Sequence, residues 1–354
     1  MAHAHAETAA DVPKPPGPDP EWASYDDERL LDLRIRDLGL RLDRTGLQPR
    51  LSELEKELAE KNLAFRPHFW LSDEWFTPDG VAGIAIPFYL AHPRLARLEQ
   101  AQMLEVEGAS HEWCLRILRH EAGHAIENAF GLRRRADRRS LFGSSSTPYP
   151  RSYVPRPYSR SYVVHLDAWY AQSHPDEDFA ETFAVWLDPR TDWRVRYAGW
   201  PALRKLEFVD GLMTELAGAR PPVHSRRTVQ PVAKLDKTLR AHYRQRRRFY
   251  GVGRAPDFDR DLVRLFSDRV EHAQRPSAAR LIERMRRDAR RKVARWTGMY
   301  QYTVDLVVKQ MIERCQALDL RVGVPEDEAR AEFLVLLTAQ AIRYMSTGRH
   351  RVPL

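Results

Sequence analysis

Two histidines and a glutamate form the first candidate for chemistry in this 354-residue sequence. His120, Glu121 and His124 stand in the run HEAGH, inside a stretch (110–130) whose apolar spacing and following glycine predict a helix. Histidines four residues apart on a helix point the same way, so both rings can reach one metal ion. Glu121 lies beside that ion, where a carboxylate can take a proton from metal-bound water. The pattern predicts a metal-dependent hydrolase.

A third ligand is expected from an acidic segment further along the chain. Glu177 and Glu181 stand four residues apart on an otherwise apolar helix predicted over 176–187. Two carboxylates on one buried helix face are costly unless a cation meets them, and a metal with its histidines would do so. We expect Glu177 to bind the metal and Glu181 to accept the N–H of a liganding imidazole, while the reverse assignment stays open. Three protein ligands leave one open position, which is typical of a catalytic Zn²⁺ site with one ion.

The sequence around these residues resembles a family of bacterial zinc-binding metallopeptidases. The resemblance covers about 28–250, and four segments carry it: WLSDEW at 70–75, IAIPFYLAHP at 84–93, LRHEAGHAI at 118–126 and YAQSHPDEDFAETFA at 170–184. The two metal-binding segments also look like the zincin site of the glutamate-ligand type, as in thermolysin and anthrax lethal factor.

This resemblance implies a zincin-like fold and favours Glu177 as the third ligand. It also implies a role for Tyr170, seven positions before Glu177, as a phenol that donates a hydrogen bond to the developing oxyanion. An aromatic core residue is the alternative interpretation of Tyr170. In zincins an extended peptide pairs with the edge strand before the metal-binding helix, which here implies a substrate-binding strand containing Ile84, Ala85 and Ile86.

The connection over 133–161 is rich in Arg, Tyr and Pro and is long for a loop inside a compact domain, which is typical of a functional segment. Arg156 and Arg160 are candidates to hold a substrate carboxylate through paired hydrogen bonds. His165 is a further candidate donor. Surface arginines and a structural histidine are the alternative interpretation.

The elements that must position these residues are predicted from hydrophobic periodicity. Alternation predicts a strand over 30–42, and strands over 65–75 and 81–90 are expected to be joined by a tight loop at 77–80. Pro87 places the latter strand at a sheet edge. Helices are predicted over 47–63, 110–130, 176–187 and 191–216, and then over 232–249, 257–271, 277–294, 300–317 and 325–346.

These elements predict an α+β fold. We expect a disordered tail over 1–27, then a zincin-like catalytic domain over 28–220 whose small mixed sheet packs on the metal-binding helix. A basic, mainly helical C-terminal region follows over 221–354.

Cysteine content, hydropathy and charge limit the kinds of site, location and partner that the protein can have. Cys114 and Cys315 lie far apart in apolar contexts, so neither a disulfide framework nor a cysteine metal site is indicated. No run approaches the length of a membrane span and no secretory signal is evident, so a cytoplasmic protein is expected. Residues 226–354 carry 29 Lys+Arg against 15 Asp+Glu. That excess could attract nucleic acid, although solvated Arg-rich helix faces are the favoured interpretation.

Three functions fit these observations. The leading prediction is a zinc peptidase that cleaves a peptide or protein substrate, with Glu121 as general base. A zinc amidase acting on a small-molecule amide would use the same metal chemistry. A non-catalytic protein could instead bind a partner or nucleic acid through the basic C-terminus, but a purely structural metal site would not require Glu121.

Overall fold

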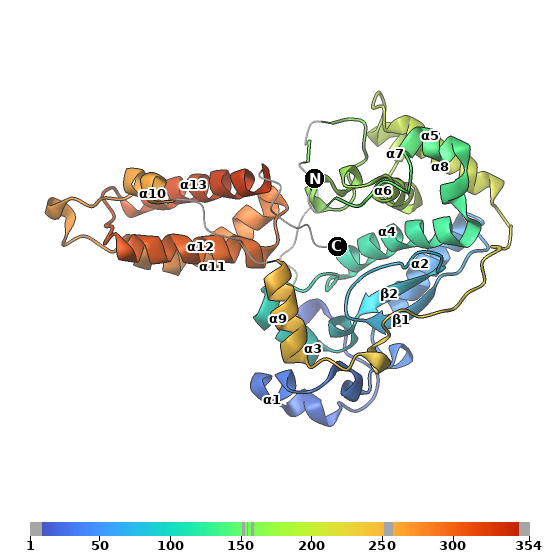
Figure 1. Cartoon of the computed structure of the whole chain (residues 1–354), viewed down its shortest axis with the longest axis horizontal. Coiled ribbons are helices and arrows are strands. Elements are labelled where there is room, and N and C mark those ends of the chain that lie inside the picture. The colour runs from blue at the N-terminus through green and yellow to red at the C-terminus, as the bar shows by residue number, and fades with distance from the viewer. Residues whose placement is uncertain (1–8, 151–152, 154, 157–158, 251–257, 347–354) are drawn as a thin grey trace. The chain divides into compact units, whose positions relative to one another are not determined.

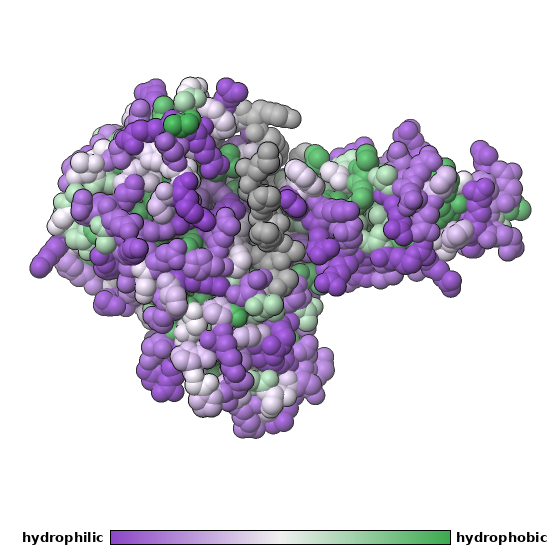
Figure 2. Space-filling view, turned by 180° about the vertical axis from the view of Figure 1, so that it is seen from behind, coloured by the Kyte–Doolittle hydropathy of each residue, from purple (hydrophilic) through white to green (hydrophobic). Residues whose placement is uncertain are grey.

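The computed structural model describes residues 9–150, 153, 155–156, 159–250 and 258–346. The chain divides into two compact units, the first formed by the described residues up to Arg244 and the second by those from Gln245 onward (Figure 1). Figure 2 shows mainly hydrophilic residues on the face seen there. No helix of the described part is long and apolar enough to cross a membrane.

The first unit is mainly helical and contains a two-stranded sheet, which is compatible with the predicted α+β class. Its elements are α1 (Asp27–Leu31), α2 (Gln48–Glu60), β1 (His68–Ser72), β2 (Gly83–Pro87), α3 (Pro93–Met103), α4 (His111–Phe130), α5 (Ala136–Phe142), α6 (Pro175–Leu187), α7 (Trp193–Arg196) and α8 (Leu203–Glu215). Helix α9 (Leu239–Phe249) spans the division between the units.

Helix α4 is the longest element of the first unit, and its ends follow from local sequence. The Ser110 side chain accepts a hydrogen bond from the Trp113 amide, and Gly131 ends the helix in the left-handed conformation at a φ of 65°. Helix α6 begins at Pro175, after His174 accepts a hydrogen bond from the Asp176 amide. The predicted helices over 110–130 and 176–187 are confirmed.

The sheet differs from the predicted hairpin because β1 and β2 run parallel, with His68 paired to Gly83. The chain between them crosses to the other side of β2, where Phe76 forms an antiparallel bridge with Ala85. The Asn128 amide on α4 donates to the carbonyls of Pro78 and Val81 and fixes this crossover. The chain does turn near residues 77–80, as predicted, but this turn is part of a crossover connection and not of a hairpin.

Two N-terminal predictions were wrong. The stretch 30–42 forms α1 and a 3-10 turn over Ile35–Leu38 instead of a strand, because its buried residues Leu30, Leu31, Ile35 and Leu38 follow helical spacing. The predicted tail over 1–27 is packed in its described part, 9–27. Trp22 is buried there, and its indole N–H donates to the Leu38 carbonyl.

The first unit continues past residue 220, where the sequence predicted a domain boundary. Trp70 and Ser72 donate hydrogen bonds to the carbonyls of Val229 and Gln230, so this segment lies along β1. The predicted helix over 191–216 is divided into α7 and α8, because Gly199 takes a φ of 75° and Pro201 follows it.

The second unit has its own apolar core. It contains α10 (Asp259–Leu265), α11 (Ala278–Thr297), α12 (Gln301–Ala317) and α13 (Glu326–Ser346). The predicted helices over 277–294, 300–317 and 325–346 are confirmed, whereas 257–271 forms only the short α10 and a 3-10 turn. Buried Asp305 accepts hydrogen bonds from Arg286 and Arg290, which ties α11 to α12.

The closest approach between α4 and α6 gives a stability prediction. A Cβ on Gly123 would lie 2.7 Å from the Ala180 Cα and 3.1 Å from its carbonyl oxygen. We expect Gly123→Ala to destabilise the protein by about 1–3 kcal/mol, since backbone must move to admit the methyl group. Urea unfolding measures this change. Gly211→Ala is the matched control because that helical glycine has nothing within 4 Å. An equal response of both variants would contradict the proposed close packing.

Candidate metal centre

Three potential ligand atoms converge where α4 faces α6. The Nε2 atoms of His120 and His124 lie 3.2 Å apart, and each lies 3.1 Å from the Oε2 atom of Glu177. All three side chains are buried. Tetrahedral zinc with bonds of about 2.0–2.1 Å separates its ligand atoms by about 3.3 Å. The three donors therefore fit a zinc ion, with a further position left for another ligand.

The charges around this triangle favour a cation. Burial alone would raise the pKa of Glu177, but His124 and His120 hold it well below its usual range. Burial likewise opposes a charge on His120, but Glu177 and Glu181 raise its pKa to about 10. Paired carboxylates thus stabilise positive charge among these donor atoms, whether it is carried by protons or by a metal ion.

Glu181 contacts the far side of the first histidine. One carboxylate oxygen lies 2.8 Å from the Nδ1 atom of His120, and the other accepts a hydrogen bond from the Leu166 amide at 2.8 Å. This pair orients the ring and leaves its Nε2 atom facing Glu177 and His124. The structure therefore places Glu177 among the candidate ligand atoms and Glu181 behind His120.

Glu121 lies on the same helix and is fully buried. Neither of its carboxylate oxygens has a hydrogen-bond partner among the described residues, and burial raises its pKa. A buried carboxylate without a partner is costly, which is the situation expected of a group that acts on a bound water or substrate.

Tyr170 lies beside the histidines, in a 3-10 turn over Asp167–Gln172. Its ring centroid is 5.6 Å from that of His120. The preceding residue, Trp169, has a φ of 53°, an uncommon conformation for a bulky residue. Burial and then the charge of Glu177 raise the pKa of Tyr170 well above its usual value. The phenol therefore keeps its proton and can donate a hydrogen bond.

Tyr149 is a contact that the sequence reasoning missed. Its hydroxyl donates to the Oε1 atom of Glu177 at 2.8 Å, and its ring stacks on His174 at 3.7 Å between centroids. It belongs to the Tyr- and Arg-rich connection, where no periodicity relates it to the metal-binding helices. The unusual length of that connection was the only available signal.

The predicted substrate-binding strand is covered in the structure. Ile84, Ala85 and Ile86 are fully buried, and the Ala85 amide donates to the Phe76 carbonyl, so β2 offers no open edge at that position. This correction follows from the crossover, which occupies the side of β2 that a hairpin would have left free.

The remaining candidates have other partners. The guanidinium of Arg160 lies over the Trp200 ring, and the Arg156 backbone exchanges two hydrogen bonds with the Gln172 side chain. His165 lies 2.9 Å from the Arg116 carbonyl, and burial lowers its pKa to about 4. A neutral, structurally bonded His165 is therefore the better interpretation.

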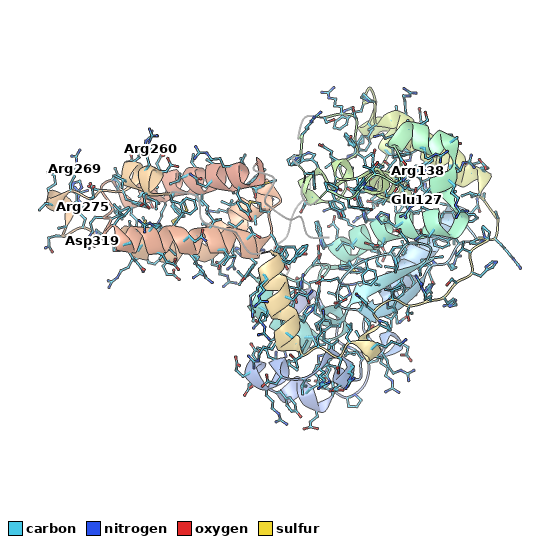
Figure 3. All side chains as sticks on the ribbon, viewed as in Figure 1. Glu127, Arg138, Arg260, Arg269, Arg275 and Asp319 are labelled. Atoms are coloured by element: carbon cyan, nitrogen blue, oxygen red, sulfur yellow. The ribbon has the colours of Figure 1, made fainter. Side chains whose placement is uncertain are left out.

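A buried arginine connects the two metal-binding helices. Arg138, on α5, donates to Glu127 on α4 at 2.8 Å and to Asp176 on α6 at 2.7 Å (Figure 3). Arg138 and Glu127 are fully buried, and Asp176 is nearly so. Arg133 also contacts both carboxylates, at 3.3 Å from Glu127 and 3.4 Å from Asp176. Two arginines thus compensate two carboxylates that lie one helical turn or less from His124 and Glu177.

Residues 112–194 match the model of a family described as "Putative zinc-binding metallo-peptidase". The matched stretch contains the three candidate ligands, Glu121 and Glu181. This match supports a zinc metallohydrolase. No curated protein and no solved structure matches the chain.

The different positions of the two glutamates give a metal-binding prediction. Glu181→Ala should lower zinc affinity about 10–100-fold, as loss of a residue that orients a ligand does. Glu177→Ala should lower it further, because it removes a donor atom. Chelator competition and the zinc content of the purified protein measure both effects. The opposite order would exchange the two roles.

Arg138 gives a second prediction. Arg138→Met should cost about 3–5 kcal/mol of unfolding free energy, because Glu127 and Asp176 stay buried with less compensation. Arg135→Ala is the control, since its pairs with Asp137 and Glu215 are largely exposed and should contribute at most about 1 kcal/mol. Equal losses in urea unfolding would show that burial of the Arg138 pairs is unimportant.

Proposed function

We propose that the protein is a zinc-dependent peptidase of the zincin type, with one zinc ion held by His120, His124 and Glu177. The observation that carries this proposal is the pairing of three converging donor atoms with the buried carboxylate of Glu121, whose oxygens accept no hydrogen bond from the described residues. The match over residues 112–194 supports the choice of zinc and of an amide bond.

The chain's own residues would divide the reaction between them. Zinc, when bound, supplies a Lewis acid and a water of lowered pKa. Glu121 takes the proton of the attacking water and later returns it to the leaving amine. Tyr170 donates its phenolic proton in a hydrogen bond to the oxygen that gains charge. Glu181 keeps the His120 ring in the orientation that directs its Nε2 atom into the site.

The proposal is tested most directly with a mixed peptide library, incubated with the zinc-loaded protein and analysed by mass spectrometry. A peptidase produces new termini at defined positions, and chelation abolishes them. Cleavage of simple amides without cleavage of any peptide would instead favour a small-molecule amidase. Tight zinc binding with neither activity would contradict a hydrolase.

Glu121→Gln provides the test of the general base. The amide has nearly the same shape but cannot accept the proton, so hydrolysis should fall about 10²–10⁴-fold. Zinc content should be unchanged because Glu121 lies outside the ligand triangle. Hydrolysis at the parent rate would remove Glu121 from the mechanism.

Tyr170→Phe provides the test of the oxyanion donor. Loss of one such donor should lower kcat about 10²–10³-fold with little change in zinc affinity. A ring that serves only in packing would give a different result, namely a lower thermal midpoint and an unchanged kcat. Steady-state kinetics and thermal unfolding of the same preparation separate these outcomes.

A further inference from the structure

The two carboxylate oxygens of Glu177 have different partners. Oε2 lies 3.1 Å from both histidine Nε2 atoms, whereas Oε1 accepts the hydrogen bond of the Tyr149 hydroxyl at 2.8 Å. A tyrosine phenol is ordinarily protonated at neutral pH, so the Tyr149 hydroxyl is the donor in this hydrogen bond. A short hydrogen bond to a carboxylate is among the stronger polar contacts in proteins.

The Tyr149 ring is itself held in place by the start of α6. It stacks almost parallel on His174, with 13° between the two planes. His174 is fixed in turn, because its Nδ1 atom accepts the Asp176 amide and its Nε2 atom lies 2.7 Å from the Thr147 carbonyl. Ser145 adds a hydrogen bond to the Asp176 carboxylate. Residues 145–149 therefore contact the start of α6 at His174 and Asp176, immediately before Glu177.

The geometry points to Tyr149 as a positioning residue that makes Glu177 a one-oxygen metal ligand, by occupying Oε1 and leaving only Oε2 for the ion. A carboxylate with both oxygens free can bind through both and fill the coordination position that a catalytic zinc keeps open. This inference rests on the metal site of the proposed function, but not on the bond that the protein hydrolyses.

Tyr149→Phe tests this role, because it removes one hydroxyl from a residue that is 58% exposed. We expect zinc affinity, measured by chelator competition, to fall about 10-fold or more, because the carboxylate of Glu177 loses the hydrogen bond that orients it. The cobalt-substituted variant should show a weaker visible absorption than the parent, because a second bond from Glu177 would raise the coordination number above four. Neither measurement depends on hydrolysis.

Tyr162→Phe is the matched control. Its half-buried ring packs under the Lys205 ammonium instead of contacting Glu177, and the substitution should change neither zinc affinity nor the cobalt spectrum. A double-mutant cycle adds a second measurement: in the Glu177→Ala background, Tyr149→Phe should have no further effect. This comparison remains informative even if one variant is less stable.

The outcomes are distinguishable. Unchanged affinity and an unchanged cobalt spectrum in Tyr149→Phe would overturn the positioning role, as would an undiminished effect in the Glu177→Ala background. Failure of the parent protein to bind zinc would overturn the metal site itself. Zinc binding without peptide cleavage would overturn only the peptidase assignment and would leave the role of Tyr149 intact.

Discussion

The metal site depends on how closely α4 and α6 approach each other. Gly123 presents no side chain to the backbone of Ala180, and this contact lies between the two histidines of one helix and the two glutamates of the other. Because each pair is four residues apart, both pairs point into the same interface. The close contact at Gly123 and the donor triangle therefore lie in the same helix interface, and the packing of that interface sets the distances between the donor atoms.

The interface of α4 and α6 brings several carboxylates into the protein interior. Nearby positively charged side chains compensate most of them. Arg138 meets Glu127 and Asp176, and Lys205 lies 2.6 Å from Asp178. The histidines contact Glu177 and Glu181 and stabilise their negative charge. Glu121 stands apart, since neither of its oxygens has a partner within the described residues. The two histidines only partly offset the cost of burying this carboxylate, since its pKa is still raised. A folded protein tolerates such a group where its function needs it, which is why the proposed mechanism gives Glu121 the role of the base.

The sequence predicted the parts of the site whose relation is local. Four-residue spacing on a helix is fixed by helix geometry, so His120 with His124 and Glu177 with Glu181 could be paired from the sequence alone. Tyr149 could not be found in this way, because its contact with Glu177 depends on the path of an irregular connection. The parallel order of the strands was missed for the same reason. A turn signature shows that the chain bends but does not show on which side of a strand it returns.

The path of the chain after α8 also decides where the first unit ends. Beyond residue 220 the backbone supplies acceptors to Trp70 and Ser72 on β1, and Ile35 donates to the Lys237 carbonyl while Leu239 donates to the Leu33 carbonyl. The sequence predicted a domain boundary at residue 220, but these hydrogen bonds hold the following segment against the first unit. The candidate metal ligands thus belong to a unit that extends to Arg244, whereas the C-terminal helices have a core of their own. Two separate cores allow the basic helices to serve a purpose other than the chemistry at the metal site.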